Sequence, residues 1–209
     1  MRDCARDPPP AKQNLQIQKR RFVSFLCVPG VVCKRLRGCA LKVKPVVELP
    51  PLTGAVKSAS AGGVTVKVAP LLRDEESQEL FEANLPLGGV LPLRVEIEYE
   101  SGVPVELKRA RFRLRDGAGK EWKLLSTKQA ISQIMKANGV YVYNPGSRKL
   151  FEQEFTAYAI DLKAPLSPTD RRRQGFLFFQ TPNKEPVASP RGLVLLGERL
   201  PQPIEIALN

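Results

Sequence analysis

The sequence predicts a mainly β protein, an immunoglobulin-like β-sandwich of about eight or nine short strands with two short helices, over residues 64–209. Two observations carry this prediction. Apolar and polar residues alternate along several short segments, which is the pattern of strands with one buried face. Turn residues, mainly Gly, Asp, Asn and Pro, separate these segments, as expected of antiparallel neighbours.

The clearest alternation lies at 91–99, where apolar residues occupy every second position and charged residues fill most of the positions between them. If this strand forms a hairpin with 109–115, Glu98 faces Arg109 and Glu96 faces Arg111, each pair contributing roughly 0.2–1 kcal/mol. We therefore interpret both charged faces as a solvent-exposed salt ladder. The same signals predict further strands at 64–68, 110–114, 122–124, 140–143, 151–160, 175–179, 192–196 and 204–208.

Two of these strands, GFLFF at 175–179 and GLVLL at 192–196, are unbroken apolar runs. Successive strand residues point to opposite faces, so such a run has no face suited to water. We expect Phe176 and Phe178 to lie on one side of the sheet and Leu177 and Phe179 on the other, with both sides covered.

Two helices are expected between the strands. Asp74 is placed to cap a helix over 75–81. Ser126 and Gln129 fit the capping box that begins a helix, and residues 131, 134 and 135 form its apolar face. Asn138-Gly139 then ends this helix, because Gly readily adopts the left-handed conformation of a C-cap.

Lys and Arg number 33 against 21 Asp and Glu, and histidine is absent. Residues 1–44 alone carry a net charge of +9 out of the total of +12, so the remaining chain is nearly balanced. This distribution argues against a nucleic-acid-binding surface, and we expect no nucleic-acid partner. Without histidine, no Ser-His-Asp triad, Cys-His dyad or His-ligated metal site can form within this chain.

The four cysteines, Cys4, Cys27, Cys33 and Cys39, all lie in the first 39 residues. A disulfide framework needs cysteines spread through the folded part, and a zinc site needs closely spaced ligand pairs. We therefore expect no metal and no cofactor.

Residues 1–39 have the order of a secretory signal: the basic cluster 19–21 precedes an uncharged apolar stretch, 22–33. This stretch is too short to span a bilayer. The eighteen residues before the cluster are long for a signal, which favours a later translation start. The alternative is a cytoplasmic protein with a disordered basic tail.

The segment Leu36-Arg37-Gly38-Cys39-Ala40 resembles the lipobox of bacterial lipoproteins. The resemblance implies cleavage before Cys39, a lipid on its sulfur and, because Ala40 replaces the Asp typical of inner-membrane retention, an outer-membrane anchor facing the periplasm. Residues 40–63, rich in Pro, Gly, Ala and Ser, are expected to form a flexible tether.

The body is similar to uncharacterised bacterial cell-envelope lipoproteins with a single immunoglobulin-like β-sandwich domain. The matching stretches are FEANLPLGGVLPLRVEIEYESGVPVEL at 81–107, ARFRLRDGAG at 110–119, RRRQGFLFF at 171–179 and GLVLL at 192–196. These positions determine fold more than chemistry, so the resemblance implies location and architecture.

We therefore expect a non-enzymatic envelope lipoprotein that serves as a structural or interaction module, with no catalytic residues and with an envelope protein as a candidate partner. The alternatives are an assembly or chaperone-like factor that recruits partners by a sheet edge, and an enzyme that uses carboxylates. The candidate contacts with an anionic surface are Arg171, Arg172 and Arg173, which otherwise form a solvated turn. The tyrosines of 140–146 could contact a sugar or a peptide, but core packing explains them better. The segment 117–120 is too short for a phosphate-binding loop.

Overall fold

The computed structural model describes residues 49, 52, 55–100, 102–139 and 145–209. Cys39, the basic N-terminal segment and the predicted strand 140–143 lie outside this part. The described chain forms strands at β1 Lys57–Ala61, β2 Val64–Pro70, β3 Val90–Tyr99, β4 Arg111–Arg115, β5 Glu121–Leu125, β6 Arg172–Gln180, β7 Val194–Glu198 and β8 Ile204–Ala207. It forms helices at α1 Asp74–Phe81, α2 Thr127–Ala137 and α3 Pro145–Ala157, with short 3₁₀ turns at Pro86–Gly88 and Leu107–Arg109.

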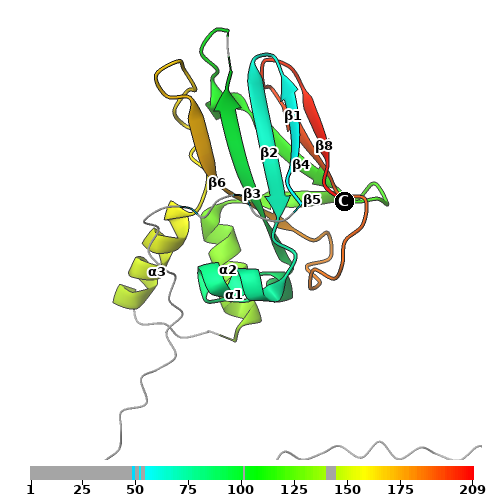
Figure 1. The fold of residues 1–209 in the computed structure, drawn as a ribbon. Coiled ribbons are helices and arrows are strands. Elements are labelled where there is room, and N and C mark those ends of the chain that lie inside the picture. Colours follow the sequence, from blue (N-terminus) through cyan, green and yellow to red (C-terminus); the bar gives the residue numbers. More distant parts are fainter. Residues whose placement is uncertain (1–48, 50–51, 53–54, 101, 140–144) are drawn as a thin grey trace, which may run out of the picture. The chain divides into compact units, whose positions relative to one another are not determined.

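All pairings between these strands are antiparallel, in the order β1-β2-β3-β6-β5-β4-β7-β8. The first and last strands of this order, β1 and β8, lie beside each other, so the sheet curls until it is nearly closed (Figure 1). At one end of this seam the turn at Gly62 packs on Pro201, where an added Cβ would lie 2.8 Å from the proline Cβ. The mainly β class is therefore confirmed. The sandwich is not confirmed, because one barrel-like sheet replaces two facing sheets.

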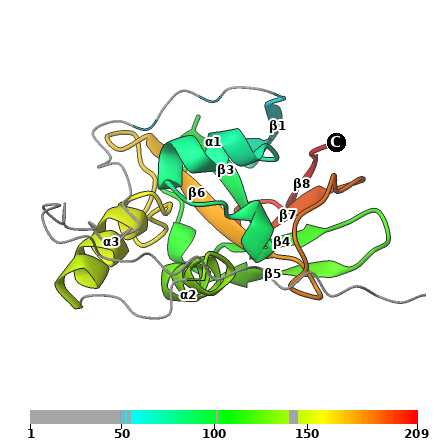
Figure 2. The same ribbon diagram turned by 90° about the horizontal axis from the view of Figure 1, so that it is seen from below.

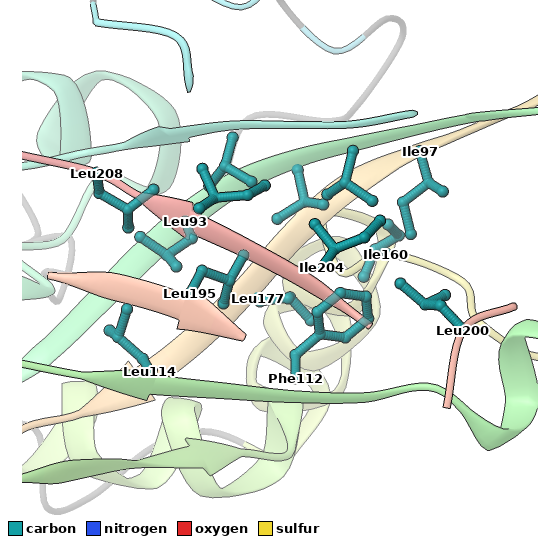
Figure 3. Packing of buried hydrophobic residues seen from close by; sticks show 14 of the residues in the cluster. Leu93, Ile97, Phe112, Leu114, Ile160, Leu177, Leu195, Leu200, Ile204 and Leu208 are labelled. Carbon is teal, nitrogen blue, oxygen red and sulfur yellow. The ribbon is translucent and has the colours of Figure 1, made fainter. Parts of the chain in front are cut away.

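The inner face of this sheet carries the larger core. Alternating residues of every long strand point inward, as the period of two requires, and they pack against one another across the barrel (Figure 3). The residues labelled there, which come from several strands and connections, are Leu93, Ile97, Phe112, Leu114, Ile160, Leu177, Leu195, Leu200, Ile204 and Leu208.

A second core fills the space between the outer face of β3 and β6 and the helices. It is rich in aromatic rings: Phe155 of α3 stacks on Phe178 at 4.9 Å, and Phe81 of α1 meets Phe176 edge-on at 5.4 Å. Phe176 and Phe178 thus face the helices, whereas Leu177 and Phe179 belong to the barrel core. The prediction for GFLFF, with both faces covered, is confirmed.

The two predicted helices are present as α1 and α2. In α2 the Ser126 side chain accepts from the Gln129 N–H and the Gln129 side chain accepts from the Ser126 N–H, so the capping box is complete. Asn138 ends α2, and Gly139 follows with φ +70°. Helix α1 begins at Asp74 itself, preceded by Arg73 in an extended conformation, so Asp74 is its first residue rather than its cap.

Three further predictions from the sequence are wrong. The expected strand at 151–160 is largely helical, because α3 continues to Ala157. Part of the expected tether belongs to the sheet, since β1 pairs with β2 along its length. The expected hairpin between 91–99 and 109–115 does not form: β3 lies between β2 and β6, and β4 lies between β5 and β7.

Candidate functional site

A pocket of about 400 Å³ lies where the β4–β5 turn meets the connection between β6 and β7. This connection, residues 181–193, has thirteen residues and no helix or strand of its own. Connections of this length in a compact domain are uncommon and are usually either functional or disordered. Here the connection is ordered, and we refer to it as the 181–193 loop.

The turn on one side of the pocket is organised by Asp116. Its Oδ1 accepts hydrogen bonds from the backbone N–H groups of Ala118 and Lys120, at 3.0 and 2.9 Å, and its Oδ2 accepts from the indole N–H of Trp122 at 3.3 Å. Burial acts to raise the pKa of the Asp116 carboxyl, but these hydrogen bonds outweigh it and lower the pKa. The carboxylate therefore holds both the turn and the indole in place.

The 181–193 loop is held by hydrogen bonds to two other parts of the chain. The N–H of Thr181 donates to the carbonyl of Gly89 at 3.0 Å, and the N–H of Val187 donates to the carbonyl of Pro86 at 2.9 Å. On the other side, the N–H of Gly117 donates to the carbonyl of Arg191 at 3.0 Å. The loop is thus pinned to the β4–β5 turn and to the 3₁₀ turn before β3.

The end of the chain fastens the loop as well. The side-chain oxygen of Asn209 accepts from the N–H of Leu193 at 2.8 Å, and its amide nitrogen donates to the carbonyl of Pro190. A single side chain therefore ties β8 to the last part of the loop.

The backbone of the 181–193 loop is strained at two positions. Lys184 and Ser189 have φ values of +60° and +39°, in the left-handed region that non-glycine residues rarely adopt. Such residues cost about 1–3 kcal/mol each and persist only where the surroundings hold them. Two of them in one loop indicate that the loop's shape is maintained at an energetic cost.

The lining of the pocket combines apolar surfaces with charges. Trp122, only 5% exposed, stands near Pro182, Pro186 and Val187, while polar and charged groups surround them. This combination of a rigid apolar wall with a few polar groups is typical of small-ligand and peptide sites. The charged residues that line it are Asp116, Lys120, Glu185 and Arg191.

The glutamates that the sequence singled out lie elsewhere, on the outer face of β2, β3 and β6. Lys67 Nζ lies 2.7 Å from Glu98 and 3.3 Å from Glu96, and Arg172 pairs with Glu96 from the other side. The Glu96 side chain is only 5% exposed. Burial acts to raise its pKa, but the hydrogen bonds donated by Arg172 and Lys67 outweigh burial and lower it, so Glu96 is ionised at neutral pH.

The salt ladder expected from the sequence therefore forms with other partners, and its expected exposure to solvent is wrong at Glu96, which is buried. Glu96 and Glu98 meet Lys67 and Arg172 rather than Arg109 and Arg111, because β3 does not neighbour β4. Glu100 accepts a hydrogen bond from the hydroxyl of Thr65.

Each of the three arginines expected to meet an anionic surface has a partner within the chain. Arg171 donates to the backbone carbonyls of Tyr99 and Glu100, at 3.4 and 3.2 Å. Arg172 pairs with Glu96, and Arg173 pairs with Asp170. Arg171 and Arg172 join the start of β6 to β3 and the residue after it, whereas the Arg173 pair is local to the start of β6.

The sequence motifs did not point to the 181–193 loop as a candidate site. A signal was available, because the segment PNKEPVASP at 182–190 places three prolines at four-residue intervals between two apolar strands. The segment 117–120, set aside as a phosphate-binding loop, proves to be the opposite wall of the pocket.

Within the described residues, no three His, Cys, Asp or Glu side chains lie together in a way that could hold a metal ion. None of the helices in this part is long and apolar enough to cross a membrane. Comparisons with protein-family models, with curated proteins and with solved structures found no match for this chain.

Proposed function

We propose that this protein is a non-enzymatic interaction module of the bacterial cell envelope, held at the outer membrane by a lipid on Cys39 and facing the periplasm. Its partner, an envelope protein, binds in the pocket between the β4–β5 turn and the 181–193 loop. The observation that carries the pocket's role is the ordered loop itself, which is hydrogen-bonded at both ends and strained in two places. The proposed anchor rests on the lipobox-like segment, and the proposed kinship with envelope lipoproteins of immunoglobulin-like type rests on the matching stretches.

The physical reason lies in the entropy of loops. Ordering a residue's backbone costs about 1–2 kcal/mol, so a long loop is normally left mobile unless its shape is needed. Most of the loop is exposed, with Val187, Pro190 and Gly192 half-buried and only Thr181 and Leu193 buried. Core packing therefore accounts for the loop's ends but not for its middle, and a binding role accounts for the rest.

The carboxylates favour a structural role over a catalytic one. A general base needs a carboxylate that faces substrate in a cleft, with a pKa raised toward neutrality. Glu96 and Glu98 instead pair with Lys67 on the outer face of the sheet, and the Glu96 pKa is lowered. These contacts join three strands.

Recruitment by a sheet edge is the second candidate for the same envelope role. It needs an open strand edge with room for another strand at about 4.8 Å on its free side. The two edge strands, β1 and β8, lie beside each other, and Gly62 packs against Pro201 at one end of the seam. We therefore prefer the pocket as the contact site.

The anchor is tested by cell fractionation with metabolic lipid labelling of the wild type and of Cys39→Ser. We expect the wild type to be labelled and to fractionate with the outer membrane, and Cys39→Ser to be unlabelled and released. An unlabelled wild type in the cytoplasmic fraction overturns the proposed location.

The pocket is tested separately by photocrosslinking in cells. A benzophenone amino acid replaces Ala188, which lines the pocket, or Ser132, an exposed residue of α2 that serves as the matched control. We expect one discrete adduct from position 188, absent from position 132 and lost when Ala118→Trp fills the pocket. Equal adducts at both positions, or an adduct that survives Ala118→Trp, contradict the assignment.

A further inference from the structure

Strand β4 carries three arginines on its outer face, Arg111, Arg113 and Arg115, which we name the β4 arginine row. All three are exposed, while Phe112 and Leu114 between them are buried in the barrel core. Alternate residues of a strand are about 6.6–6.8 Å apart, so the row presents three guanidinium groups at regular intervals.

The positive charge of this row is only partly neutralised. Arg113 lies 3.7 Å from Glu121 and 3.6 Å from Glu198, both long distances for an ion pair. No carboxylate of the described residues lies within ion-pair distance of Arg111 or Arg115. Neither arginine side chain donates a hydrogen bond to an acceptor of the described residues. This separates the row from Arg171–Arg173, whose guanidinium groups all have partners in the chain.

The face that carries the row is also uncovered by the described elements. The helices pack on the outer face of β3 and β6, and Figure 2 shows them gathered away from β7 and β8. The strand next to the row, β7, contributes Val194 and Leu196 to the same face, and both are half-buried. The surface therefore combines guanidinium groups with apolar side chains and with the carboxylates of Glu121, Glu198 and Glu205, which lie on the same outer face.

We propose that the β4 arginine row binds the phosphate groups of anionic phospholipids and so docks this face of the domain on a membrane. Guanidinium groups bind phosphate through paired hydrogen bonds, and desolvating an arginine costs less than desolvating a lysine. Each row position can engage one headgroup while Val194 and Leu196 meet the interface.

We choose a membrane as the occupant because the segment that precedes the domain carries the proposed lipid anchor. This step rests on the proposed anchor at Cys39. Nine residues, 40–48, separate that cysteine from Leu49, which packs against the second core, and a chain of this length spans at most about 30 Å. A domain on such a tether meets the membrane surface at high effective concentration, so even a few phosphate contacts suffice to orient it.

The test uses the purified full chain with Cys39→Ser, so that lipidation plays no part, on vesicles of phosphatidylglycerol and phosphatidylcholine. A benzophenone amino acid replaces Lys123, an exposed β5 residue in line with Glu121 and therefore beside the row, or Lys136, an exposed residue of α2. The basic segment 1–44 holds every variant near the vesicles, so lipid adducts report which face meets the lipid.

We expect lipid adducts at position 123 to exceed those at position 136 at least about five-fold. The pair Arg111→Glu and Arg115→Glu reduces the adducts at 123 about ten-fold, whereas the charge-matched pair Lys128→Glu and Lys149→Glu leaves them within about two-fold. The conservative double variant, Arg111→Lys and Arg115→Lys, should retain part of the lipid adducts at position 123. Thermal melting of each variant shows that the fold is retained.

The proposal is overturned by equal lipid adducts at positions 123 and 136, or by adducts at position 123 that persist in the Arg111→Glu and Arg115→Glu variant. It is also overturned if no adducts form on anionic vesicles, which is the result expected if the row binds an acidic protein instead. The vesicle experiment is independent of the anchor. If Cys39 is not labelled in cells, the proposed anchor is wrong, but the vesicle experiment still shows whether the row binds lipid.

Discussion

Gly175 in β6 lies directly against the backbone of residues 159–160, where the chain leaves α3. A Cβ added at Gly175 would lie 2.8 Å from the carbonyl carbon of Ala159 and closer still to Ile160. The same contact brings the N–H of Phe176 to the carbonyl of Tyr158 at 2.8 Å, and the N–H of Ile160 to the carbonyl of Phe176. Backbone hydrogen bonds therefore join the sheet to the end of the helical layer at this point.

Gly175→Ala should therefore destabilise the protein by about 3 kcal/mol, because a methyl group would force two backbone segments apart. Urea unfolding of the full chain measures the change. Gly88→Ala is the control, since its added Cβ would approach nothing closer than the Ala137 Cβ at 3.3 Å. Equal losses from the two substitutions would show that the close approach at Gly175 is not rigid.

Phe178→Ala should cost about 3–5 kcal/mol, which is much of the stability of a domain of this size. The ring is 2% exposed and stacks on Phe155, so its removal loses transfer energy and leaves a cavity beneath α3. Thermal melting of the full chain is expected to show a greatly lowered Tm. Leu150→Ala, a truncation of an exposed apolar residue on α3, should change the Tm little. An unchanged Tm for Phe178→Ala would mean that the helices do not seal this face.

The partners of Glu98 can be identified by exchanging charges. Glu98→Lys should cost at most about 1 kcal/mol, because the side chain is 33% exposed and its pair with Lys67 is partly solvated. Adding Lys67→Glu should restore part of this loss, as expected for neighbours in one ion-pair network. Adding Arg109→Glu should restore nothing, since Arg109 lies in the 3₁₀ turn before β4. Rescue by Arg109→Glu instead would indicate the hairpin that the sequence alone suggests.

Glu96 should contribute to the acid sensitivity of folding. Its pKa in the folded protein is below the ordinary value of 4.5, so the folded state binds fewer protons there than the unfolded chain. Its contribution is present above pH 4.5 and is lost as the pH falls through the lowered folded-state pKa. Glu96→Gln should therefore flatten the fall in unfolding free energy below pH 4.5.

Urea unfolding at a series of pH values between 3 and 7 measures this dependence. Glu205→Gln is the matched control, because Glu205 is exposed on β8 and forms no ion pair with the described residues. If both variants flatten the acid limb equally, the effect comes from total charge and not from the contacts of Glu96 with Arg172 and Lys67.

The sequence predicted well those features that depend only on the local pattern of residues. The alternation in β3, the two covered faces of GFLFF and the capping box of Ser126 and Gln129 all appear in the structure. Each depends only on the geometry of one element, in which side chains repeat every two residues along a strand or occupy fixed positions at a helix start. Such features need no knowledge of which element lies next to them.

The segment 151–160 shows where local pattern is insufficient. Phe151, Phe155 and Tyr158 are spaced as one face of a helix, yet the stretch also contains enough aromatic and branched residues to favour a strand. Packing decides between the two, because the helix places the Phe155 and Tyr158 rings against Phe81, Phe176 and Phe178 together. That gain depends on residues far apart in the chain.

By itself, the sequence determined the mainly β class, the inward-facing residues and the two ends of α2. Only the tertiary structure decided that β3 lies between β2 and β6, that the sheet curls until β1 meets β8, and that a proline-rich loop closes on the β4–β5 turn to form a pocket. The physical reason is that alternation states which face of a strand avoids water but not which strand lies beside it. Pairing is chosen by the burial of all strands at once, and a pocket exists only where two such distant segments meet.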